Sequence, residues 1–474
     1  MPNLSRRHFM IGTSCFALTA LAGVPAVRAA EYDSHLVASP REVSFFGDQG
    51  LATSVWSYGA TPGPTLRFKQ GQNVRIKLSN ELPDPTTVHW HGLRIENAMD
   101  GVPFLNQKPI APGESFIYDF LAKDAGTYWY HPHVNSAEQV GRGLSGAIVV
   151  EEPEPIVVDR DLVWVVDDWR LRRDGTLAPF DDFHDATHGG RMGNVVTING
   201  EAQPRLSVRR GERIRLRLIN AANARVFGLK FPSADVWRVA VDGHPVDPSQ
   251  VAGDELVMVS PGGRIDLILD MNGEPGETTI VEDHYYPRYS YAMAEIEYST
   301  DPPIRSGAPA APKRLAENPV AIPDLAKAER HEMLFEGGAM GGLRQAEYKG
   351  EVLGLRDLAG MGLVWAVNGK MIPPMTEADI GSPMLTMERG KSYVLSWHNK
   401  TAFDHPIHLH GHSFHLISTD GKRLEKPIIM DTVLIQPDQS VEVAFIADNP
   451  GDWALHCHVL EHAEAGMMGF VRVV

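Results

Sequence analysis

One pattern, P-x-L-x4-G-x8-N, occurs three times along this chain with the same internal spacing. The copies run from Pro64 to Asn80, from Pro204 to Asn220 and from Pro383 to Asn399. Between the glycine and the asparagine, apolar and polar residues alternate, as in "QNVRIKLSN" and "ERIRLRLIN", and this alternation is typical of a strand with one buried face. Glycine and proline are frequent, and stretches with helical periodicity are few. The sequence therefore predicts three consecutive all-β sandwich domains.

The three copies also indicate where each domain begins and ends. We expect domains at residues 30–152, 153–300 and 331–474, which is the number expected for a chain of this length. Residues 301–330 are rich in proline and alanine, and we interpret them as a linker.

The first 29 residues are predicted to be a targeting segment rather than part of the fold. Residues 5–10, "SRRHFM", form a twin-arginine pattern, an apolar run follows, and "VRA" at residues 27–29 offers a small-residue cleavage site. The apolar run is short and contains Gly12, Gly23 and Pro25, which argues against a membrane anchor. We expect export by the twin-arginine route to the periplasm, with no membrane insertion after the leader is removed.

The net charge excludes some partners. It is −16 for the whole chain, and removing the leader takes away Arg6, Arg7 and Arg28 but no acid, which gives −19. So acidic a protein is poorly suited to nucleic acid or to anionic membranes. We expect a monomer that acts on small molecules.

Cysteine is used sparingly. Of the two cysteines, Cys15 lies in the leader, so Cys457 alone remains and no intramolecular disulfide can form. A free thiol in an oxidising compartment is a liability unless something holds it, and a metal ion would hold it.

Paired histidines follow the first and third copies of the pattern. Nine residues after Asn80 and Asn399 come two H-x-H pairs, and a second pair begins five residues after Gly126 and Gly451. The pairs are His89 and His91, His131 and His133, His408 and His410, and His456 and His458. Side chains two apart on a strand share a face, and neutral imidazole is the commonest protein ligand for metals. If the outer domains pack together, the eight side chains can hold several metal ions.

The middle copy lacks these histidines. Leu229 and Phe231 stand where the first pair would be, and the sequence "VED" at residues 281–283 replaces the second. The sequence therefore predicts that the middle domain has no metal site and that Leu229 and Phe231 belong to its core.

Strand alternation puts Cys457 on the face opposite His456 and His458. His405, His462 and Met467 are its candidate partners. One cysteine, two histidines and a weak axial methionine form the ligand set of a blue-copper electron-transfer site. The thiolate is thus predicted to connect one copper ion to a cluster behind it.

Four stretches resemble the copper-binding motifs of the multicopper oxidases, the three-domain laccase-like family. They are "HWHGLRIENAMDGVP", "WYHPHV", "HPIHLHGHSF" and "HCHVLEHAEAGMM", and the resemblance covers essentially the whole mature chain. It implies three cupredoxin-like Greek-key domains. It also implies one type 1, one type 2 and two type 3 copper ions, with electrons from a reductant passing to a trinuclear cluster that reduces dioxygen to water.

The resemblance also implies the copper ligands, position by position. The type 1 ligands are His405, Cys457 and His462, with Met467 axial. The type 2 ligands are His89 and His408. The type 3 ligands are His91, His131 and His458 for one ion, and His133, His410 and His456 for the other.

Two acids are candidate catalytic residues. Asp100, in "MDGVP", matches an acid that the family places near the type 2 copper, where it would orient a water molecule or pass protons. Many bacterial members carry an acid directly after the second type 1 histidine, but here that residue is Ala463 and Glu464 follows. Proton supply on the type 3 side then falls to Glu464, another residue or water.

Four further histidines are not assigned to the metal sites. We interpret His412 and His415 as packing or hydrogen-bonding residues, and His184 and His188 as solvated loop residues.

Three functions fit the sequence. Phe403, two residues before His405, favours an aromatic donor such as a phenol or aromatic amine over a hydrated cation. Cuprous oxidation for copper tolerance is the alternative, because seven methionines lie between residues 331 and 387, although they are scattered along the segment rather than clustered. A copper-free cell-division protein of the same fold is a third possibility, against which the complete ligand sets argue. Three repeats exclude two-domain copper nitrite reductases.

Overall fold

The computed structural model describes residues 32–47, 50–286, 288–305, 307–372, 376 and 380–474. The predicted leader lies outside the described residues, and so does Met375. No helix within the described ranges is long and apolar enough to cross a bilayer.

The regular secondary structure of the described residues is almost entirely β-strand, which confirms the predicted fold class. Residues 34–151 form two four-stranded sheets, and residues 160–298 form a six-stranded and a five-stranded sheet. Residues 329–473 form a six-stranded and a five-stranded sheet, with a two-stranded sheet beside them. We call these three groups the first, middle and third sandwich.

The first sandwich contains β1 (Ser34–Val43), β2 (Thr53–Ser57), β3 (Gly63–Lys69), β4 (Gln72–Asn80), β5 (His89–His91), β6 (Ser115–Ala122), β7 (Gly126–His131) and β8 (Gly146–Glu151), with the 3-10 helix η2 (Asn97–Met99) and the helix α1 (Ser136–Gly141).

The middle sandwich contains β9 (Arg160–Trp169), β10 (Val195–Ile198), β11 (Arg205–Val208), β12 (Arg213–Asn220), β13 (Phe227–Lys230), β14 (Ala234–Val241), β15 (His244–Gln250), β16 (Val257–Val259), β17 (Arg264–Met271), β18 (Thr278–Asp283) and β19 (Tyr291–Tyr298), with the helix α2 (Phe183–Thr187).

The third sandwich contains β20 (Glu329–Gly337), β21 (Gln345–Tyr348), β22 (Glu351–Gly354), β23 (Trp365–Val367), β24 (Leu385–Met387), β25 (Ser392–Asn399), β26 (His405–Leu409), β27 (Phe414–Thr419), β28 (Lys422–Met430), β29 (Thr432–Ile435), β30 (Ser440–Ile446), β31 (Gly451–Cys457) and β32 (Met468–Val473), with the helices α3 (Leu355–Gly360) and α4 (Leu460–Glu464).

The repeated pattern has one structural role in all three sandwiches. Its glycines turn the chain at φ values of 81°, 80° and 83°, a region that favours glycine. Its asparagines are buried at the ends of β4, β12 and β25. Asn80 Nδ2 donates to two main-chain carbonyls and Oδ1 accepts from the amide two residues on, and Asn220 and Asn399 make the equivalent bonds. The pattern therefore repeats because each copy closes the same turn and anchors the same loop.

The strands that follow the glycines also take equivalent places. β4, β12 and β25 pair in parallel with β1, β9 and β20, and antiparallel with β6, β17 and β30. Each pair of sheets encloses its own apolar core. Leu229 and Phe231 belong to the core of the middle sandwich, as predicted.

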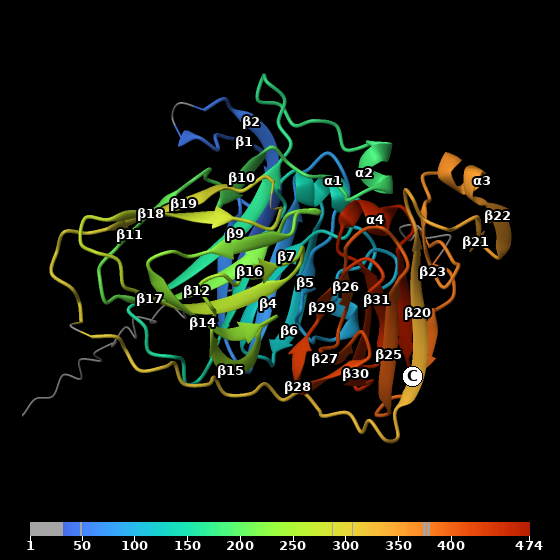
Figure 1. The fold of residues 1–474 in the computed structure, drawn as a ribbon. Helices are drawn as coiled ribbons and strands as arrows, with labels where there is room; N and C mark the ends of the chain where they lie inside the picture. The colour runs from blue at the N-terminus through green and yellow to red at the C-terminus, as the bar shows by residue number, and fades with distance from the viewer. Residues whose placement is uncertain (1–31, 48–49, 287, 306, 373–375, 377–379) are drawn as a thin grey trace, which may run out of the picture.

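The first and third sandwiches lie side by side, with β5 and β7 facing β26 and β31 (Figure 1). Asn97 Nδ2 donates to the Asp452 carbonyl at 2.6 Å, and Asn449 Nδ2 donates to the Ile95 carbonyl at 2.9 Å, so polar side chains connect the two. Residues 301–305 and 307–328 form no helix or strand, but Asn318 is buried and bonds the Ala125 carbonyl. The outer sandwiches are thus adjacent, as convergence of their histidines requires.

Candidate metal centres

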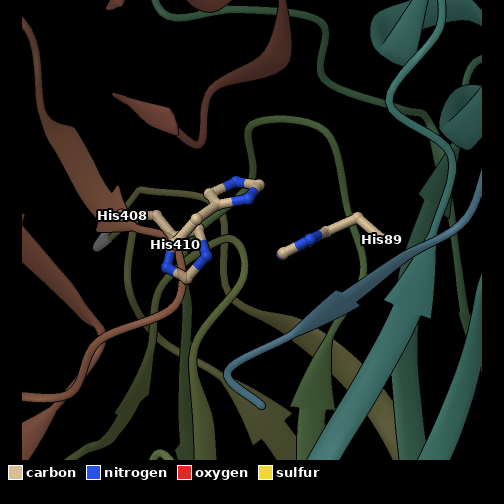
Figure 2. A group of neighbouring side chains, drawn as sticks. All are labelled: His89, His408 and His410. Carbon is tan, nitrogen blue, oxygen red and sulfur yellow. The ribbon is translucent and has the colours of Figure 1, made fainter. Parts of the chain in front are cut away.

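The eight paired histidines meet at the boundary between the first and third sandwiches, and all eight are buried. Strand pairing sets their positions, because His89 pairs with His131 across β5 and β7, and His408 pairs with His456 across β26 and β31. Rings from opposite sandwiches stack, with centroids 3.8 Å apart for His89 and His410. Figure 2 shows the imidazoles of His408 and His410 facing that of His89. The predicted convergence is therefore present in the structure.

Most of these imidazoles are anchored by one nitrogen and offer the other to the cluster. The Nδ1 atoms of His89, His131 and His408 lie 2.8 to 2.9 Å from main-chain carbonyls. Their Nε2 atoms are buried without any hydrogen-bond partner. His91 is reversed, with Nε2 held and Nδ1 free of partners. Carbonyl anchoring fixes which nitrogen carries the proton, so the other nitrogen presents a lone pair, as a metal ligand must.

Three other rings bring their nitrogens together. His456 Nε2 lies 3.3 Å from His133 Nε2 and 3.1 Å from His410 Nε2, and the ligand atoms of the three lie within 4.8 Å of one another. His458 makes no hydrogen bond through either ring nitrogen. Burial lowers the pKa of these histidines, to about 3 for His456, so the rings are neutral. Buried lone pairs without donors are unfavourable unless a cation binds them, so the donor set fits metal ions.

His89 lies near the centre of the cluster. Its ligand atom is within 4.8 Å of those of His408 and His410, and also of those of His91 and His131. Ring centroids of His458 lie 5.0 Å from His91 and 5.3 Å from His131. The histidines form one continuous cluster rather than separate pairs.

Cys457 lies in a second group on the other face of β31. Its Sγ is 3.4 Å from His405 Nδ1 and 3.8 Å from His462 Nδ1, and these nitrogens are 3.1 Å apart. Burial raises the pKa of the thiol and so favours its protonated form. The thiolate form therefore needs a positive partner. Met467 is buried. Its main chain hydrogen-bonds the main chains of Cys457 and His462, which places it beside the group. Two nitrogens and one sulfur within a few ångströms fit copper.

The two predicted acids both lie next to the cluster. Asp100 is buried, with Oδ2 accepting from His410 Nδ1 at 2.9 Å and Oδ1 3.2 Å from His89 Nδ1, so it connects the two sandwiches. Glu464 ends α4, lines a small cavity together with His133 and His456, and accepts from the Ala137 amide at 2.9 Å. Burial raises its pKa to about 7.

Sequence reasoning missed a third acid, Asp431, and its partner in the middle sandwich. Asp431 Oδ1 lies 3.2 Å from His91 Nε2 and 3.4 Å from His408 Nδ1. Arg264 donates to both carboxylate oxygens, at 2.7 and 2.6 Å. Burial acts to raise the pKa of Asp431, but the Arg264 charge and the bonds from Arg264 and the histidines outweigh it and hold the pKa well below its usual range. Nothing in the histidine spacing points to this pair. Only Arg264, a charged residue in the largely apolar stretch "RIDLIL" that also contains Asp266, could have drawn attention.

The middle sandwich also contacts the metal sites through its backbone. Gly262 has φ of 78°, and a Cβ there would lie 2.7 Å from the His458 ring. His462 Nε2 bonds the His188 carbonyl at 2.6 Å. The middle sandwich lacks copper-ligand histidines at the repeat positions, yet it shapes both groups.

The remaining histidines differ in part from expectation. His412 and His415 are buried, and His412 Nδ1 lies 3.3 Å from the His410 carbonyl, in keeping with a packing role. His184 is exposed, but it lies on α2 rather than in a loop. His188 lies in the turn after α2 with a half-buried side chain, and its main-chain carbonyl bonds His462, a contact that the sequence did not indicate.

A buried Cys–His–His group beside a buried eight-histidine cluster defines a copper-dependent oxidoreductase with two linked metal sites. Comparisons with known proteins agree. Three family models, each described as multicopper oxidase, match residues 42–155, 160–298 and 363–474.

Individual relatives give the same result. A multicopper oxidase structure from Pseudomonas thermotolerans is 34% identical with a TM-score of 0.80, over 93% of this chain and 98% of that one. The multicopper oxidase MmcO of Mycobacterium tuberculosis is 29% identical over 88% of this chain and 83% of its own length. Laccase-1 of Fomitopsis schrenkii is 30% identical over 87% of this chain and 81% of its own length. This chain belongs to the multicopper oxidase family.

Proposed function

We propose that this enzyme is a laccase-type oxidase, which oxidises phenols or aromatic amines one electron at a time and reduces dioxygen to water. The observation that carries the proposal is the pair of linked groups, because Cys457 at the end of β31 belongs to one group while its neighbours His456 and His458 belong to the other. Four one-electron oxidations must be collected before one dioxygen molecule is reduced, and a separate electron-accepting site joined to a cluster meets that need.

We propose four copper ions per chain. His405, Cys457 and His462, with Met467 axial, would hold type 1 copper. His89 and His408 would hold type 2 copper, and the remaining six histidines of the cluster would hold the type 3 pair. When bound, copper would supply the cycling between two oxidation states that moves single electrons.

The chain's own residues would orient these ligands and move protons. Carbonyls and carboxylates fix the outer nitrogen of most rings, which leaves the inner nitrogen deprotonated and aimed at the cluster. Asp100, which is bonded to His410, would orient water or pass protons on the type 2 side. Glu464 would serve the type 3 side, because it lines the same cavity as His133 and His456.

Methionine positions favour the aromatic donor over cuprous ion. Met333, Met371 and Met387 are core residues, as expected of apolar filler. Met340 and Met361 are exposed, at 81% and 49%, and are the described methionines of residues 331–387 best placed to meet Cu(I) from solvent. Unpaired ring nitrogens throughout the cluster argue against a copper-free interaction protein.

We also propose the domain boundaries, export route and monomeric state that the sequence suggests. Residues 30–152, 153–300 and 331–474 would be the domains, with 301–330 as linker. The twin-arginine pattern supports export to the periplasm.

Steady-state dioxygen consumption by the copper-loaded enzyme tests the donor. A simple phenol, an aromatic diamine and Cu(I) would be compared, with and without added Cu(II). We expect turnover of both organic donors without added Cu(II), and turnover of the phenol within about threefold after Met340→Leu and Met361→Leu together. An enzyme inert towards phenols until copper is added, and weakened towards Cu(I) by the two substitutions, would instead be a cuprous oxidase.

A further inference from the structure

Both imidazoles of the Cys457 group are sealed from solvent. His405 and His462 have no exposed surface, and their outer nitrogens are occupied. His405 Nε2 lies 2.8 Å from Thr401 Oγ1, and His462 Nε2 donates to the His188 carbonyl at 2.6 Å. The proposed type 1 site therefore offers no exposed histidine edge that a donor could touch. The chain at His188 covers the Nε2 edge of the His462 ring.

We call residues 183–188, "FHDATH", the capping segment. Three successive carbonyls in it accept hydrogen bonds from the third sandwich. Ala186 accepts from Trp365 Nε1 at 2.6 Å, Thr187 accepts from the Ala339 amide at 2.7 Å, and His188 accepts from His462. Asp185 is paired with Arg170 of the middle sandwich at 2.6 Å. With partners on both sides, the capping segment is a fixed part of the site rather than a loose cover.

The outer face of the capping segment is aromatic. Phe183 is 52% exposed and His184 is exposed, while His188 is half-buried. The imidazoles of His184 and His188 stack with centroids 3.9 Å apart at 14°, so each ring covers one face of the other, and the outer face of the exposed His184 is left as a flat aromatic surface. A planar aromatic ring packs favourably on such a surface.

Aromatic rings also connect this face to the metal group. Phe403 lies edge-on to His188 at 5.8 Å and edge-on to Trp365 at 5.9 Å, and Trp365 contacts His462 at 4.3 Å. A donor on the outer face is thus separated from His462 by packed rings and by one main-chain hydrogen bond.

We propose that the capping segment is the docking site for a single-ring phenol or aromatic amine, which lies against the stacked His184 and His188. The electron then reaches His462 through the His188 carbonyl and its hydrogen bond. A phenol gives up one electron and its hydroxyl proton, which leaves to solvent, and becomes a phenoxyl radical. Four such electrons and four protons convert one dioxygen to two waters. The proposal rests on the proposed function and adds to it where the donor binds.

The test compares reduction by two kinds of donor. Anaerobic bleaching of the blue absorption would be followed by stopped flow in His184→Ala/His188→Ala, which retains the His188 carbonyl, and in His184→Ala alone. The control is His35→Ala, an exposed histidine on β1 that bonds Ser79. Ferrocyanide, which has no ring to stack, serves as the second reductant. Binding of the electron-poor 4-nitrophenol, measured by ligand-observed NMR on the copper-loaded protein, gives a readout independent of turnover.

We expect the rate constant for the phenol to fall about tenfold in the double variant and about threefold in His184→Ala, since the single variant leaves the His188 ring for the phenol to stack on and the double variant leaves neither ring. Ferrocyanide should bleach both at near wild-type rate, with the absorption spectrum unchanged, and 4-nitrophenol binding should be lost in the double variant only. Unchanged phenol bleaching in the double variant, or an equal loss with ferrocyanide, overturns the docking site. A wild-type protein without blue absorption would overturn the proposed function itself, and the docking site with it.

Discussion

Arg264 and Asp431 form a buried ion pair between two sandwiches, with Arg264 Nη1 donating to Oδ1 at 2.7 Å and Nη2 donating to Oδ2 at 2.6 Å. Arg264 begins β17 of the middle sandwich, and Asp431 directly precedes β29 of the third. Asp431 in turn faces His91 and His408. The middle sandwich, which supplies none of the eight paired histidines, thus holds the carboxylate that orients two of them.

Arg264→Met is expected to leave Asp431 buried without its partner, which destabilises the protein by about 3–5 kcal/mol and disorders His91 and His408. Copper content should fall, and the type 2 signal in electron paramagnetic resonance should change. Arg264→Lys should restore neither the copper content nor the type 2 signal, because an ammonium group cannot make two parallel hydrogen bonds to the carboxylate. Arg213→Met is the control, since Arg213 pairs with Asp270 inside the middle sandwich. An unaltered type 2 signal and full copper in Arg264→Met would show that Arg264 does not position the cluster.

Cys457→Ser should abolish the intense thiolate-to-copper absorption and all oxidase turnover, because the serine hydroxyl cannot replace the sulfur that contacts His405 and His462. The fold should survive, since the substitution is small and the strand pairing of β31 involves main-chain atoms. The visible spectrum and circular dichroism check this. Blue colour retained in the variant would remove the type 1 assignment.

His458→Ala should separate the two metal groups. His458 directly follows β31, and its ring lies near Gly262 and His91, away from the Cys457 group. The blue absorption should therefore remain largely intact while dioxygen consumption stops. Dioxygen reduction at a rate near that of the wild type would contradict the linked-site account.

Leu229→Ala tests the middle sandwich as a core without copper. Leu229 is fully buried at the position that corresponds to His89 and His408, so truncation should destabilise the protein by about 2–5 kcal/mol. Chemical denaturation and metal analysis would measure the two effects. Loss of stoichiometric copper from the folded variant would mean that the middle sandwich does more than the repeat comparison implies.

The fold was predictable because its signals are local. Asn80, Asn220 and Asn399 anchor the loops that follow them, and alternation within one strand determines which side chains share a face. The same alternation accounts for the opposite directions of Cys457 and its neighbouring histidines.

The residues that sequence reasoning missed depend on contacts between distant parts of the chain. Arg264 and Asp431 are 167 positions apart, and His188 and His462 are 274 apart. No spacing rule relates such residues, because their contact depends on how the sandwiches pack. Asp100 was found only through a resemblance, since a single acid in a turn has no distinctive pattern of its own.

Copper analysis combined with spectroscopy of the wild-type enzyme tests the central claim most directly. Metal quantification, the visible spectrum and integrated electron paramagnetic resonance would be measured on one preparation. The account predicts four copper ions per chain, with one blue type 1 and one type 2 signal in equal amounts and the remaining pair silent. A single copper per chain without the type 2 signal, or a folded protein that takes up no copper, would contradict it.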